Sequence, residues 1–529
     1  MSIDIQSLSY IHPDGDLLFS EISFTITKGE KVSLVGNNGS GKSTILKILA
    51  NELQQSEGTV ILSEKPYYIP QHMGQYDSYS IARAMRIDEK LNALYAIFDG
   101  NASSKNFEIL NDDWEVEEKA KAALSFWGIG HLALFQSMKS LSGGEKTKVF
   151  LSGILIDSPQ IILFDEPSNH LDSESRAVLY DFIQKSKSTI LTVSHDKALL
   201  NLSDATFELS KNSIEIFAGN YDFYKDSKDH KLHTLEAQLE EKQKMIRQTR
   251  QKSIEITQQR QKQDTRGEKH SQKKMLPRII SGALSEKAER TSSKIKNTQN
   301  EKISILSKNL QDIKQQIQDQ KVLKINLCKS DLHKGKILID AKDINFSYEI
   351  ESLWKSPLTF QIRSNDRIGI TGKNGSGKTT LIKIITRDLL LHTGKITRAD
   401  FRHLYIDQEY SIINNHLSVI NQVELFNDRH LPEHELKILL HYHQFTREFW
   451  DRKCAGLSGG EKMKLILCCV AISNNTPDMI ILDEPTNNLD IYSQEVLTEA
   501  IKSFNGTIIL ISHDKHFINE IDIRNRIEL

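Results

Sequence analysis

Two glycine-rich loops with the same spacing carry the most specific chemistry in the sequence. They read Gly36-Asn-Asn-Gly-Ser-Gly-Lys-Ser43 and Gly372-Lys-Asn-Gly-Ser-Gly-Lys-Thr379. Glycines at this spacing let backbone N–H groups turn toward phosphate oxygens at the N-terminus of a helix. The lysine would add positive charge at the β- and γ-phosphates, and the final Ser or Thr would offer a hydroxyl to Mg²⁺. We therefore predict two phosphate-binding sites for a nucleotide.

A pair of carboxylates follows an apolar run in each half of the chain. Asp165-Glu166 ends one run and Asp483-Glu484 ends the other. Such a pair can direct its first carboxylate at a metal ion and its second at an attacking water. Phosphoryl transfer requires mainly positioning and charge stabilisation. We predict that Glu166 and Glu484 polarise water for hydrolysis.

A histidine ends a further strand in each half, in Ser194-His-Asp196 and Ser512-His-Asp514. A lone histidine is more often structural, but the repeated context favours a role for His195 and His513 in sensing or stabilising the γ-phosphate. Leu141-Ser-Gly-Gly-Glu145 likewise recurs as Leu457-Ser-Gly-Gly-Glu461. Four motifs thus repeat in one order, which indicates a tandem duplication with copies at about 1–222 and 336–529.

The elements that position these motifs follow from the apolar pattern. A β-branched run precedes the first glycine loop, and residues 44–50 after it fit a helix. The apolar runs 161–164 and 189–193 fit fully buried parallel strands. The first copy has 71 residues from Gln71 to Ser142, against 50 from Gln408 to Ser458. Each copy is therefore predicted to be an α/β nucleotide-binding core with a helical insert, about 20 residues longer in the first copy, near 82–118.

The segment between the copies is rich in Lys, Gln, Glu and Arg and predicts two long helices, at about 221–264 and 284–326. Helix breakers at Gly267, Pro277 and Gly282 would reverse the chain. The result would be a hairpin about 60 Å long. Apolar residues spaced by three and four predict a coiled-coil seam between the helices. They are Ile303, Leu306, Leu310, Ile313 and Ile317, with Leu232, Leu235 and Leu239 facing them.

Charge is segregated along the chain. The net charge is −2, yet residues 225–330 hold 25 Lys and Arg against 13 Asp and Glu. Residues 242–278, the distal part, hold 12 basic and 3 acidic residues. Such a basic arm is typical of a nucleic-acid contact, and a solvated helix surface is the alternative that charge alone leaves open.

Composition narrows the class of protein. No apolar stretch approaches the roughly 20 residues of a membrane-spanning helix, and the N-terminus lacks the features of a secretory signal. The four cysteines, Cys328, Cys454, Cys468 and Cys469, have no CxxC spacing that would indicate a disulfide framework or a metal site. We expect a cytoplasmic protein without a membrane partner.

Together the glycine loops, Leu-Ser-Gly-Gly-Glu segments, Asp-Glu pairs and terminal histidines resemble the ATP-binding cassette ATPases, over both copies. The resemblance implies that two cassettes face head to tail within one chain, so that each ATP lies between the glycine loop of one copy and the Leu-Ser-Gly-Gly-Glu segment of the other. The protein would then function as a monomer with ATP and Mg²⁺ as cofactors. It implies these ATP-binding residues: Tyr10, Gly36, Asn37, Asn38, Gly39, Ser40, Gly41, Lys42, Ser43, Thr44, Gln71, Ser142, Gly143, Gly144, Asp165, Tyr348, Gly372, Lys373, Asn374, Gly375, Ser376, Gly377, Lys378, Thr379, Thr380, Gln408, Ser458, Gly459, Gly460 and Asp483. The implied Mg²⁺ ligands are Ser43, Gln71, Asp165, Thr379, Gln408 and Asp483.

Within that family, tandem cassettes joined by a helical hairpin resemble the ABC-F class of translation factors. The resemblance implies binding at the ribosomal exit site when ATP is bound, with the hairpin reaching rRNA and P-site tRNA, and release on hydrolysis. The long hairpin and the early end after the second copy are most similar to the antibiotic-resistance branch. A housekeeping translation regulator and a DNA-associated ATPase of the same class stay open.

The predicted architecture is α/β, with two P-loop cassettes at 1–222 and 333–529 and a basic helical hairpin, an antiparallel coiled coil, at 223–332 whose tip lies near 265–283. Asn169-His-Leu-Asp172 in the first copy becomes Asn487-Asn-Leu-Asp490 in the second. This departure leaves the catalytic residues intact and leaves open whether the two sites are equally active.

Overall fold

The computed structural model describes residues 1–101, 103–210, 212–273, 298, 301–314, 316–317, 325, 327, 332–348, 352–373, 375–473, 475–487, 489–512 and 514–529. The predictions on Asn374, His513, Pro277 and Gly282 therefore lie outside the described residues. Met1–Asp222 and Leu323–Leu529 form one compact unit, and Phe223–Val322 form a second.

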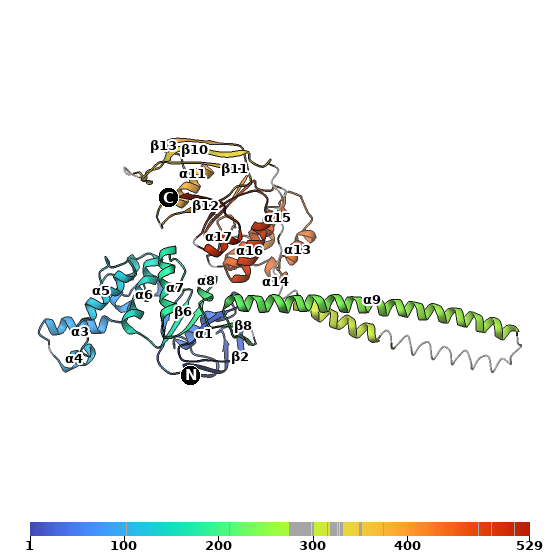
Figure 1. The fold of residues 1–529 in the computed structure, drawn as a ribbon, viewed down its shortest axis with the longest axis horizontal. Helices are drawn as coiled ribbons and strands as arrows, with labels where there is room; N and C mark the ends of the chain where they lie inside the picture. The colour runs from blue at the N-terminus through green and yellow to red at the C-terminus, as the bar shows by residue number, and fades with distance from the viewer. Residues whose placement is uncertain are drawn as a thin grey trace. The chain divides into compact units, whose positions relative to one another are not determined.

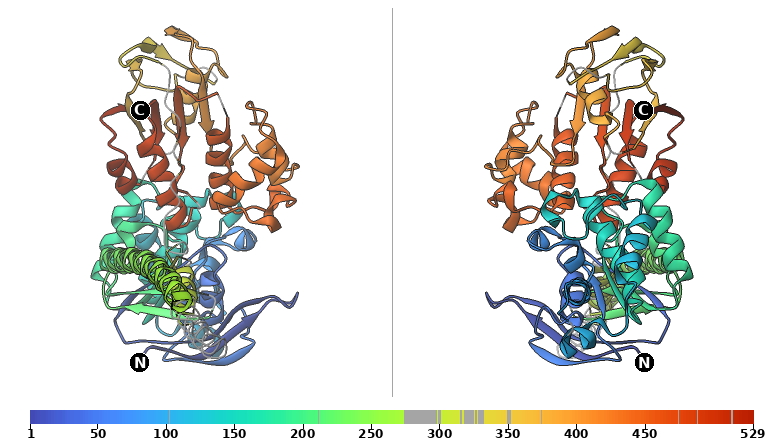
Figure 2. Two further views of the ribbon diagram at one scale, coloured as in Figure 1. Left: turned by 90° about the vertical axis from the view of Figure 1, so that its right-hand side faces the viewer. Right: turned by 90° about the vertical axis from the view of Figure 1, so that its left-hand side faces the viewer.

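The first copy contains two sheets, which occupy separate layers (Figure 2). One is antiparallel, in the order β2-β1-β4, and the other is mainly parallel, in the order β5-β6-β7-β3-β8-β9. The strands are β1 (Ile3–Ile11), β2 (Leu17–Ile26), β3 (Lys31–Val35), β4 (Glu57–Leu62), β5 (Tyr67–Ile69), β6 (Ile161–Asp165), β7 (Thr189–Val193), β8 (Ala205–Leu209) and β9 (Ile214–Phe217). Every residue of β6 and β7 is buried, as the continuous apolar runs predicted.

Helices flank these sheets and form the insert. They are α1 (Lys42–Leu49), α2 (Ile81–Ala84), α3 (Asp88–Phe98), α4 (Ser104–Leu110), α5 (Val116–Phe126), α6 (Gly143–Asp157), α7 (Ser173–Lys185) and α8 (Lys197–Leu200). The extra length of the first copy lies in α3 and α4, at the place where the sequence predicted it. Their buried side chains, such as Leu91 and Leu110, share one hydrophobic core with Val149 of α6 and Ile162 of β6.

The second copy repeats the plan, with sheet orders β11-β10-β13 and β14-β15-β16-β12-β17. Its strands are β10 (Ile337–Asn345), β11 (Leu358–Arg363), β12 (Arg367–Thr371), β13 (Thr393–Arg398), β14 (His403–Ile406), β15 (Met479–Asp483), β16 (Thr507–Ile511) and β17 (Asn525–Glu528). Its helices are α11 (Lys378–Thr386), α12 (Val419–Glu424), α13 (Glu433–Tyr442), α14 (Arg447–Trp450), α15 (Gly459–Ile472), α16 (Ile491–Ser503) and α17 (Lys515–Glu520).

The strand order explains why distant motifs meet. In the first copy β3 pairs with β7 and β7 pairs with β6, all parallel. The glycine loop follows β3, Asp165 ends β6 and His195 follows β7. Because parallel strands end at the same edge of a sheet, these groups share one edge. In the second copy β12, β16 and β15 have the corresponding order.

The second unit contains all but the first two residues of α9 (Tyr221–Lys273), a single helix of 53 residues (Figure 1). Residues 301–314 are also helical and lie beside α9 in both figures. Ile246 of α9 and Ile317 are each only 9% exposed, whereas Ile305, off the predicted seam, is 61% exposed. The predicted seam residues Ile303, Leu306, Leu310, Ile313, Leu232, Leu235 and Leu239 are all partly buried.

One prediction about this segment was wrong. Gly267 does not end the helix, because α9 continues through it to Lys273. A helical glycine costs only about 1 kcal/mol relative to alanine. The strong helix formers on both sides of Gly267 outweigh that cost.

Candidate functional site: two nucleotide-binding centres

The first glycine loop has a backbone that only glycine accepts easily. Gly41, which caps α1, has φ 100°, and a Cβ there would lie 2.7 Å from the ring of Phe19. A Cβ on Gly36 would lie 2.6 Å from the Leu209 carbonyl oxygen. Lys42 Nζ donates to the carbonyl oxygens of Gly36 and Asn37 at 2.7 and 3.0 Å. The loop is thus already folded around its lysine.

Two of the predicted Mg²⁺ ligands, Ser43 and Asp165, lie side by side at the first site. Ser43 Oγ donates to Asp165 Oδ1 at 3.0 Å, and the Tyr68 hydroxyl donates to Asp165 Oδ2 at 3.3 Å. Burial raises the pKa of Asp165 above its usual value, and the hydrogen bonds from Ser43 and Tyr68 oppose that shift. Hydroxyl and carboxylate oxygens are the ligands that Mg²⁺ prefers, so the donor set fits the ion.

Glu166 and His195 form the catalytic corner of this site. Glu166 has φ 53°, an uncommon backbone conformation for a non-glycine residue, and its N–H donates to the Val193 carbonyl at 2.8 Å. His195 Nε2 lies 3.3 Å from Glu166 Oε1. Burial, followed by the charge of Asp165, raises the pKa of Glu166 to about 8. Burial, followed by the charge of Lys42, lowers the pKa of His195 to about 3, so the imidazole is neutral at pH 7.

Two buried polar atoms of this corner remain unsatisfied in the described part of the chain. Neither Glu166 Oε1 nor His195 Nδ1 has a hydrogen-bond partner there. Unsatisfied buried polar atoms are costly and are uncommon outside functional sites. A nucleotide phosphate and a water molecule would supply the missing partners.

Cavity 1 is the space of about 330 Å³ around these groups. It is lined by His12, Leu18, Asn38, Gly39, Gly41, Lys42, Ser43, Thr44, Gln71, Asp165, Glu166, Val193 and His195. Ten predicted site residues therefore come together here. Gly36, Asn37, Ser40 and Tyr10 were also predicted and do not line cavity 1.

The second glycine loop reproduces the arrangement. Lys378 Nζ donates to the carbonyl oxygens of Gly372 and Lys373 at 2.8 and 3.0 Å. Thr379 Oγ1 and the Tyr405 hydroxyl each donate to Asp483 Oδ2 at 3.2 Å. The φ of Glu484 is 48°, and its N–H donates to the Ile511 carbonyl at 2.9 Å. The backbone strain seen at Glu166 thus recurs at the same point of the duplication.

Cavity 2, at the second loop, has a volume of about 650 Å³ and is built by both copies. The second copy contributes Tyr348, Leu353, Gly375, Gly377, Lys378, Thr379, Thr380, Gln408, Asp483, Glu484 and Asn487. The first copy contributes Ser142, Gly143, Gly144, His170, Leu171 and Arg176. The Leu-Ser-Gly-Gly-Glu segment of the first copy therefore faces the glycine loop of the second. Of the other predicted residues, Gly372, Lys373 and Ser376 do not line cavity 2.

Each Leu-Ser-Gly-Gly-Glu segment starts a helix. Ser142 caps α6 and forms a capping box with Glu145, and Ser458 and Glu461 do the same for α15. The box fixes the serine at the positive end of the helix dipole, where an anion is stabilised. His170 packs behind the first segment, since a Cβ on Gly143 would lie 3.2 Å from His170 Cγ.

The second copy also reaches the first glycine loop. Asn38 N–H donates to Asp490 Oδ2 at 3.1 Å. A Cβ on Gly460 would lie 3.8 Å from Asn38 Nδ2. Ser458, Gly459 and Gly460 nevertheless do not line cavity 1. The second site is therefore lined by residues of both copies, whereas cavity 1 at the first site is lined by the first copy alone.

One ATP-binding residue that the resemblance implied, Tyr10, does not lie at the first site. Tyr10 is 7% exposed and packs against Phe19 in the core, whereas His12 lines cavity 1. In the second copy Tyr348 lines cavity 2 and is 68% exposed, while Phe346 is buried. His12 therefore corresponds to Tyr348, and Tyr10 corresponds to Phe346.

The internal repeat could have revealed this correspondence. Ser7 and Asp343 have φ 47° and 48°, and each lies five residues before the residue that lines its cavity. The repeat also relates Tyr68 to Tyr405, two site residues that the sequence analysis did not predict. Each tyrosine lies three residues before the predicted glutamine, at Gln71 or Gln408.

Comparison with known proteins agrees with this geometry. The sequence model of the family described as ABC transporter matches residues 19–169 and 355–487. ABC transporter F family member 5 of Arabidopsis thaliana is 28% identical, over 96% of this chain and 72% of its own length. The Ribosome protection protein VmlR of Bacillus subtilis is 25% identical, over 98% of this chain and 85% of its own.

The fold is also found among solved structures. An archaeal ribosome recycling factor, aABCE1, solved in complex with the archaeal ribosomal stalk protein aP1, superposes with a TM-score of 0.58. It is 17% identical and covers 98% of this chain and 86% of its own, so it supports the fold alone. Among the described residues, no helix is long and apolar enough to cross a bilayer. With two matches that lie on the two nucleotide centres, the chain belongs to the ABC transporter family and carries its ATP-binding cassette twice.

Proposed function

We propose that this protein is an ABC-F ATPase that binds the ribosome in its ATP-bound state and leaves it after hydrolysis. The observation that carries the proposal is the combination of two catalytic centres with one long basic helix between them. From Lys242 to Lys273, α9 holds ten Lys and Arg against three Asp and Glu. A rod of that charge suits the phosphate backbone of RNA.

The hydrolytic step is assigned to residues of each centre. At the first site Glu166 would accept a proton from the attacking water, and neutral His195 would orient toward the γ-phosphate. Lys42 would stabilise the charge on the phosphate oxygens. Mg²⁺, held by Ser43 and Asp165 with Gln71 nearby, would supply charge neutralisation at the β- and γ-phosphates. Glu484, His513, Lys378 and Thr379 with Asp483 and Gln408 would act correspondingly at the second site.

Binding of ATP would draw the two copies together. The γ-phosphate at the second site would lie between Lys378 and the start of α6, where Ser142 and Gly144 offer donors. At the first site Ser458 and Gly460 of α15 would have to move onto the nucleotide. Because neither γ-phosphate can be enclosed by one copy alone, hydrolysis would loosen both contacts. We also propose that the protein is cytoplasmic and acts as a monomer.

Within this class we propose ribosomal protection against antibiotics, with the α9 hairpin directed toward P-site tRNA and the peptidyl-transferase centre. The support is the similarity to VmlR, whose name describes a ribosome protection protein. A housekeeping translation regulator is the second candidate, favoured by the similarity to ABC transporter F family member 5, whose name contains no resistance function. The domain boundaries 1–222, 223–332 and 333–529 remain part of this proposal.

The decisive experiment is cosedimentation with ribosomes. The double variant E166Q/E484Q should bind ATP without hydrolysing it and should pellet with ribosomes in ATP but not in ADP. Reversal of charge at Arg247, Arg250 and Lys252, all exposed on α9, should weaken that binding and reduce its salt dependence. Reversal at the exposed Lys65, Lys105 and Lys395 of the two copies is the matched control. Pelleting that does not depend on ATP would overturn the proposal.

Antibiotic susceptibility separates the two candidates. Cells that express the unmodified protein should become less susceptible to at least one class of ribosome-targeting drug, and cells that express E166Q/E484Q should not. Unchanged susceptibility to every class, with ATP-dependent pelleting intact, would favour the housekeeping regulator.

A further inference from the structure

A third cavity borders the second glycine loop and shares Lys378 with cavity 2. This basic cavity has a volume of about 400 Å³. It is lined by Asp172, Ser173, Glu174, Ile370, Thr371, Gly372, Lys373, Lys378, Ile511, Ser512, Lys515, Ile518, Asn519 and Arg526. Its residues from α17 and β17 do not belong to the predicted nucleotide site, whereas Gly372, Lys373 and Lys378 do.

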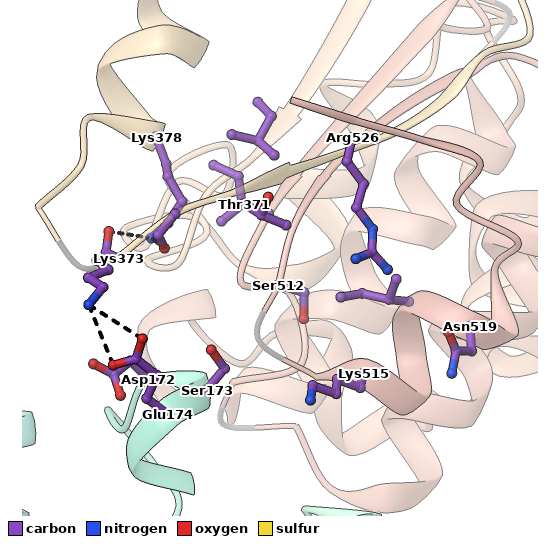
Figure 3. Close-up of a pocket in the computed structure, with 14 residues that line it drawn as sticks. Asp172, Ser173, Glu174, Thr371, Lys373, Lys378, Ser512, Lys515, Asn519 and Arg526 are labelled. Atoms are coloured by element: carbon purple, nitrogen blue, oxygen red, sulfur yellow. Dashed lines mark hydrogen bonds and ion pairs between the residues drawn. The ribbon is translucent and has the colours of Figure 1, made fainter. Parts of the chain in front are cut away.

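The lining carries a surplus of positive charge. Lys373, Lys378, Lys515 and Arg526 face the cavity against Asp172 and Glu174, which leaves two positive charges in excess. Figure 3 shows Lys373 and Lys378 on one side, Arg526 and Lys515 on the other, and Glu174 entering from the first copy. Inorganic phosphate, with about one to two negative charges near neutral pH, matches this surplus.

The individual cations differ in how far they are already neutralised. Lys373 Nζ lies 3.4 Å from Glu174 Oε1, in an ion pair between the two copies. Within the described part of the chain, neither Lys515 nor Arg526 makes an ion pair or hydrogen bond through its side chain. These two side chains are therefore available to an anion.

The basic cavity is connected to the chemistry through Lys378. This lysine lines both cavity 2 and the basic cavity. The group that would hold the γ-phosphate before cleavage therefore also borders a space rich in cations, in which phosphate could remain after cleavage. Asp172, Ser173 and Glu174 come from the first copy. They close one side of this space as long as the two copies stay together.

The first copy lacks the same residues. In the strand register Arg526 of β17 lies opposite Gly369 of β12, three positions before the second glycine loop. Thr206 of β8 lies opposite Ser33 of β3, three positions before the first glycine loop, so Thr206 is the counterpart of Arg526. Thr206 is buried and donates to the Gly219 carbonyl at 3.0 Å. Lys373 is replaced by Asn37 in the first copy.

Lys197 is the counterpart of Lys515, since each follows the Ser-His-Asp motif. It is 5% exposed and lies 3.4 Å from Glu520 Oε1, so its charge is already paired. Of the four cations of the basic cavity, Lys373 and Arg526 are thus replaced in the first copy, and the counterpart of Lys515 is paired with Glu520. Lys378 corresponds to Lys42 of the first glycine loop.

We propose that the basic cavity is a phosphate site that retains the inorganic phosphate produced at the second nucleotide site, with no counterpart at the first. This inference rests on the proposed ATPase function. Arg526 would bind the phosphate with paired N–H donors and Lys515 with its ammonium group. Release would be completed when the two copies separate and Glu174 withdraws from Lys373.

Equilibrium dialysis of the full chain, loaded with Mg²⁺ and ADP, against labelled inorganic phosphate tests the site without hydrolysis. R526T, which introduces the residue of the first copy, should weaken phosphate binding about tenfold, and K515A should also weaken it. R524A is the matched control, because Arg524 is exposed on the same segment and is paired with Asp522. Unchanged affinity in both R526T and K515A would overturn the proposal.

Single-turnover measurements with a phosphate sensor identify the source of the phosphate. In an E166Q background, in which only the second site hydrolyses, R526T should release phosphate about tenfold sooner after cleavage. In an E484Q background it should leave the release unchanged. Equal effects in both backgrounds would overturn the assignment to the second site. A chain that fails to hydrolyse ATP would instead refute the ATPase proposal, while the dialysis result would still stand.

Discussion

Asn38 of the first glycine loop donates its backbone N–H to the carboxylate of Asp490, 452 positions later in the chain, at 3.1 Å. The same carboxylate caps α16 by accepting the N–H of Ser493 at 2.7 Å. The N-terminus of a helix in the second copy is therefore tied directly to the phosphate-binding loop of the first. Closure of the first nucleotide site and the position of α16 are coupled through one side chain.

Replacement of Asp490 by Asn should reduce hydrolysis at the first site. Asn still caps α16, but its bond to the Asn38 N–H loses the contribution of the negative charge, which is worth about 1 kcal/mol. In an E484Q background, D490N should lower kcat several-fold. In an E166Q background the same substitution should have little effect. Steady-state ATPase assays of the two double variants check this expectation, and equal losses in both would contradict the coupling.

The residues proposed to contact adenine can be tested by measuring ATP affinity and protein stability separately. Y348A should weaken ATP binding at the second site about tenfold, because the exposed ring would no longer stack on the base. H12A should weaken binding at the first site. Tyr10 is buried in the core, so Y10A should lower the free energy of unfolding by about 3 kcal/mol or more. Titration with a fluorescent ATP analogue and thermal unfolding measure the two effects.

The substitution Y10F is the control for Tyr10, because it keeps the packing of the ring. It should leave both stability and ATP affinity close to those of the unmodified chain. Loss of ATP affinity in Y10A, measured well below its unfolding transition, would restore Tyr10 to the nucleotide site, because the phenylalanine of Y10F could still stack on the base.

Hydrolysis at the first site should depend on pH through Glu166. The pKa of this carboxyl is raised to about 8 by burial and by Asp165, so below pH 8 it is mostly protonated and cannot accept a proton. The rate of an E484Q variant should therefore rise close to tenfold between about pH 6 and pH 7 and level off above about pH 8. His195, with a pKa of about 3, should contribute no further change in that range. A flat profile from pH 6 to pH 9 would exclude Glu166 as the base.

Gly267 offers a stability test within α9. Because the helix continues through this residue, G267A should stabilise the helix by about 1 kcal/mol without changing its direction. Hydrogen exchange of the amides near residues 260–273 should become slower in G267A. Faster exchange would mean that this glycine marks a break in the helix.

The sequence determined the parts of this protein that depend on a few neighbouring residues. Each glycine loop, its lysine and the helix after it lie within 15 positions, so spacing alone predicted them. The buried strand β7 has the bounds predicted from its apolar run, Thr189–Val193. The duplication also predicted the second centre from the first, since Asp483 and Glu484 repeat Asp165 and Glu166, and both glutamates have a positive φ in the structure.

The tertiary structure decided what depends on register and on packing between distant strands. The positive φ of Ser7 lies where the pairing of β1 with β2 shifts register, between Ile5 and Leu8. A bulge of this kind changes which later side chains face the core, so Tyr10, which the family resemblance implied as an ATP-binding residue, lies in the core, and His12 lines cavity 1. The basic cavity was equally hidden, because Arg526 and Lys378 are 148 positions apart and meet only where β17 pairs with β12. The motifs could be predicted because their residues are close together in the chain. The side chains that come together from distant strands could not, because strand pairing decides which of them meet.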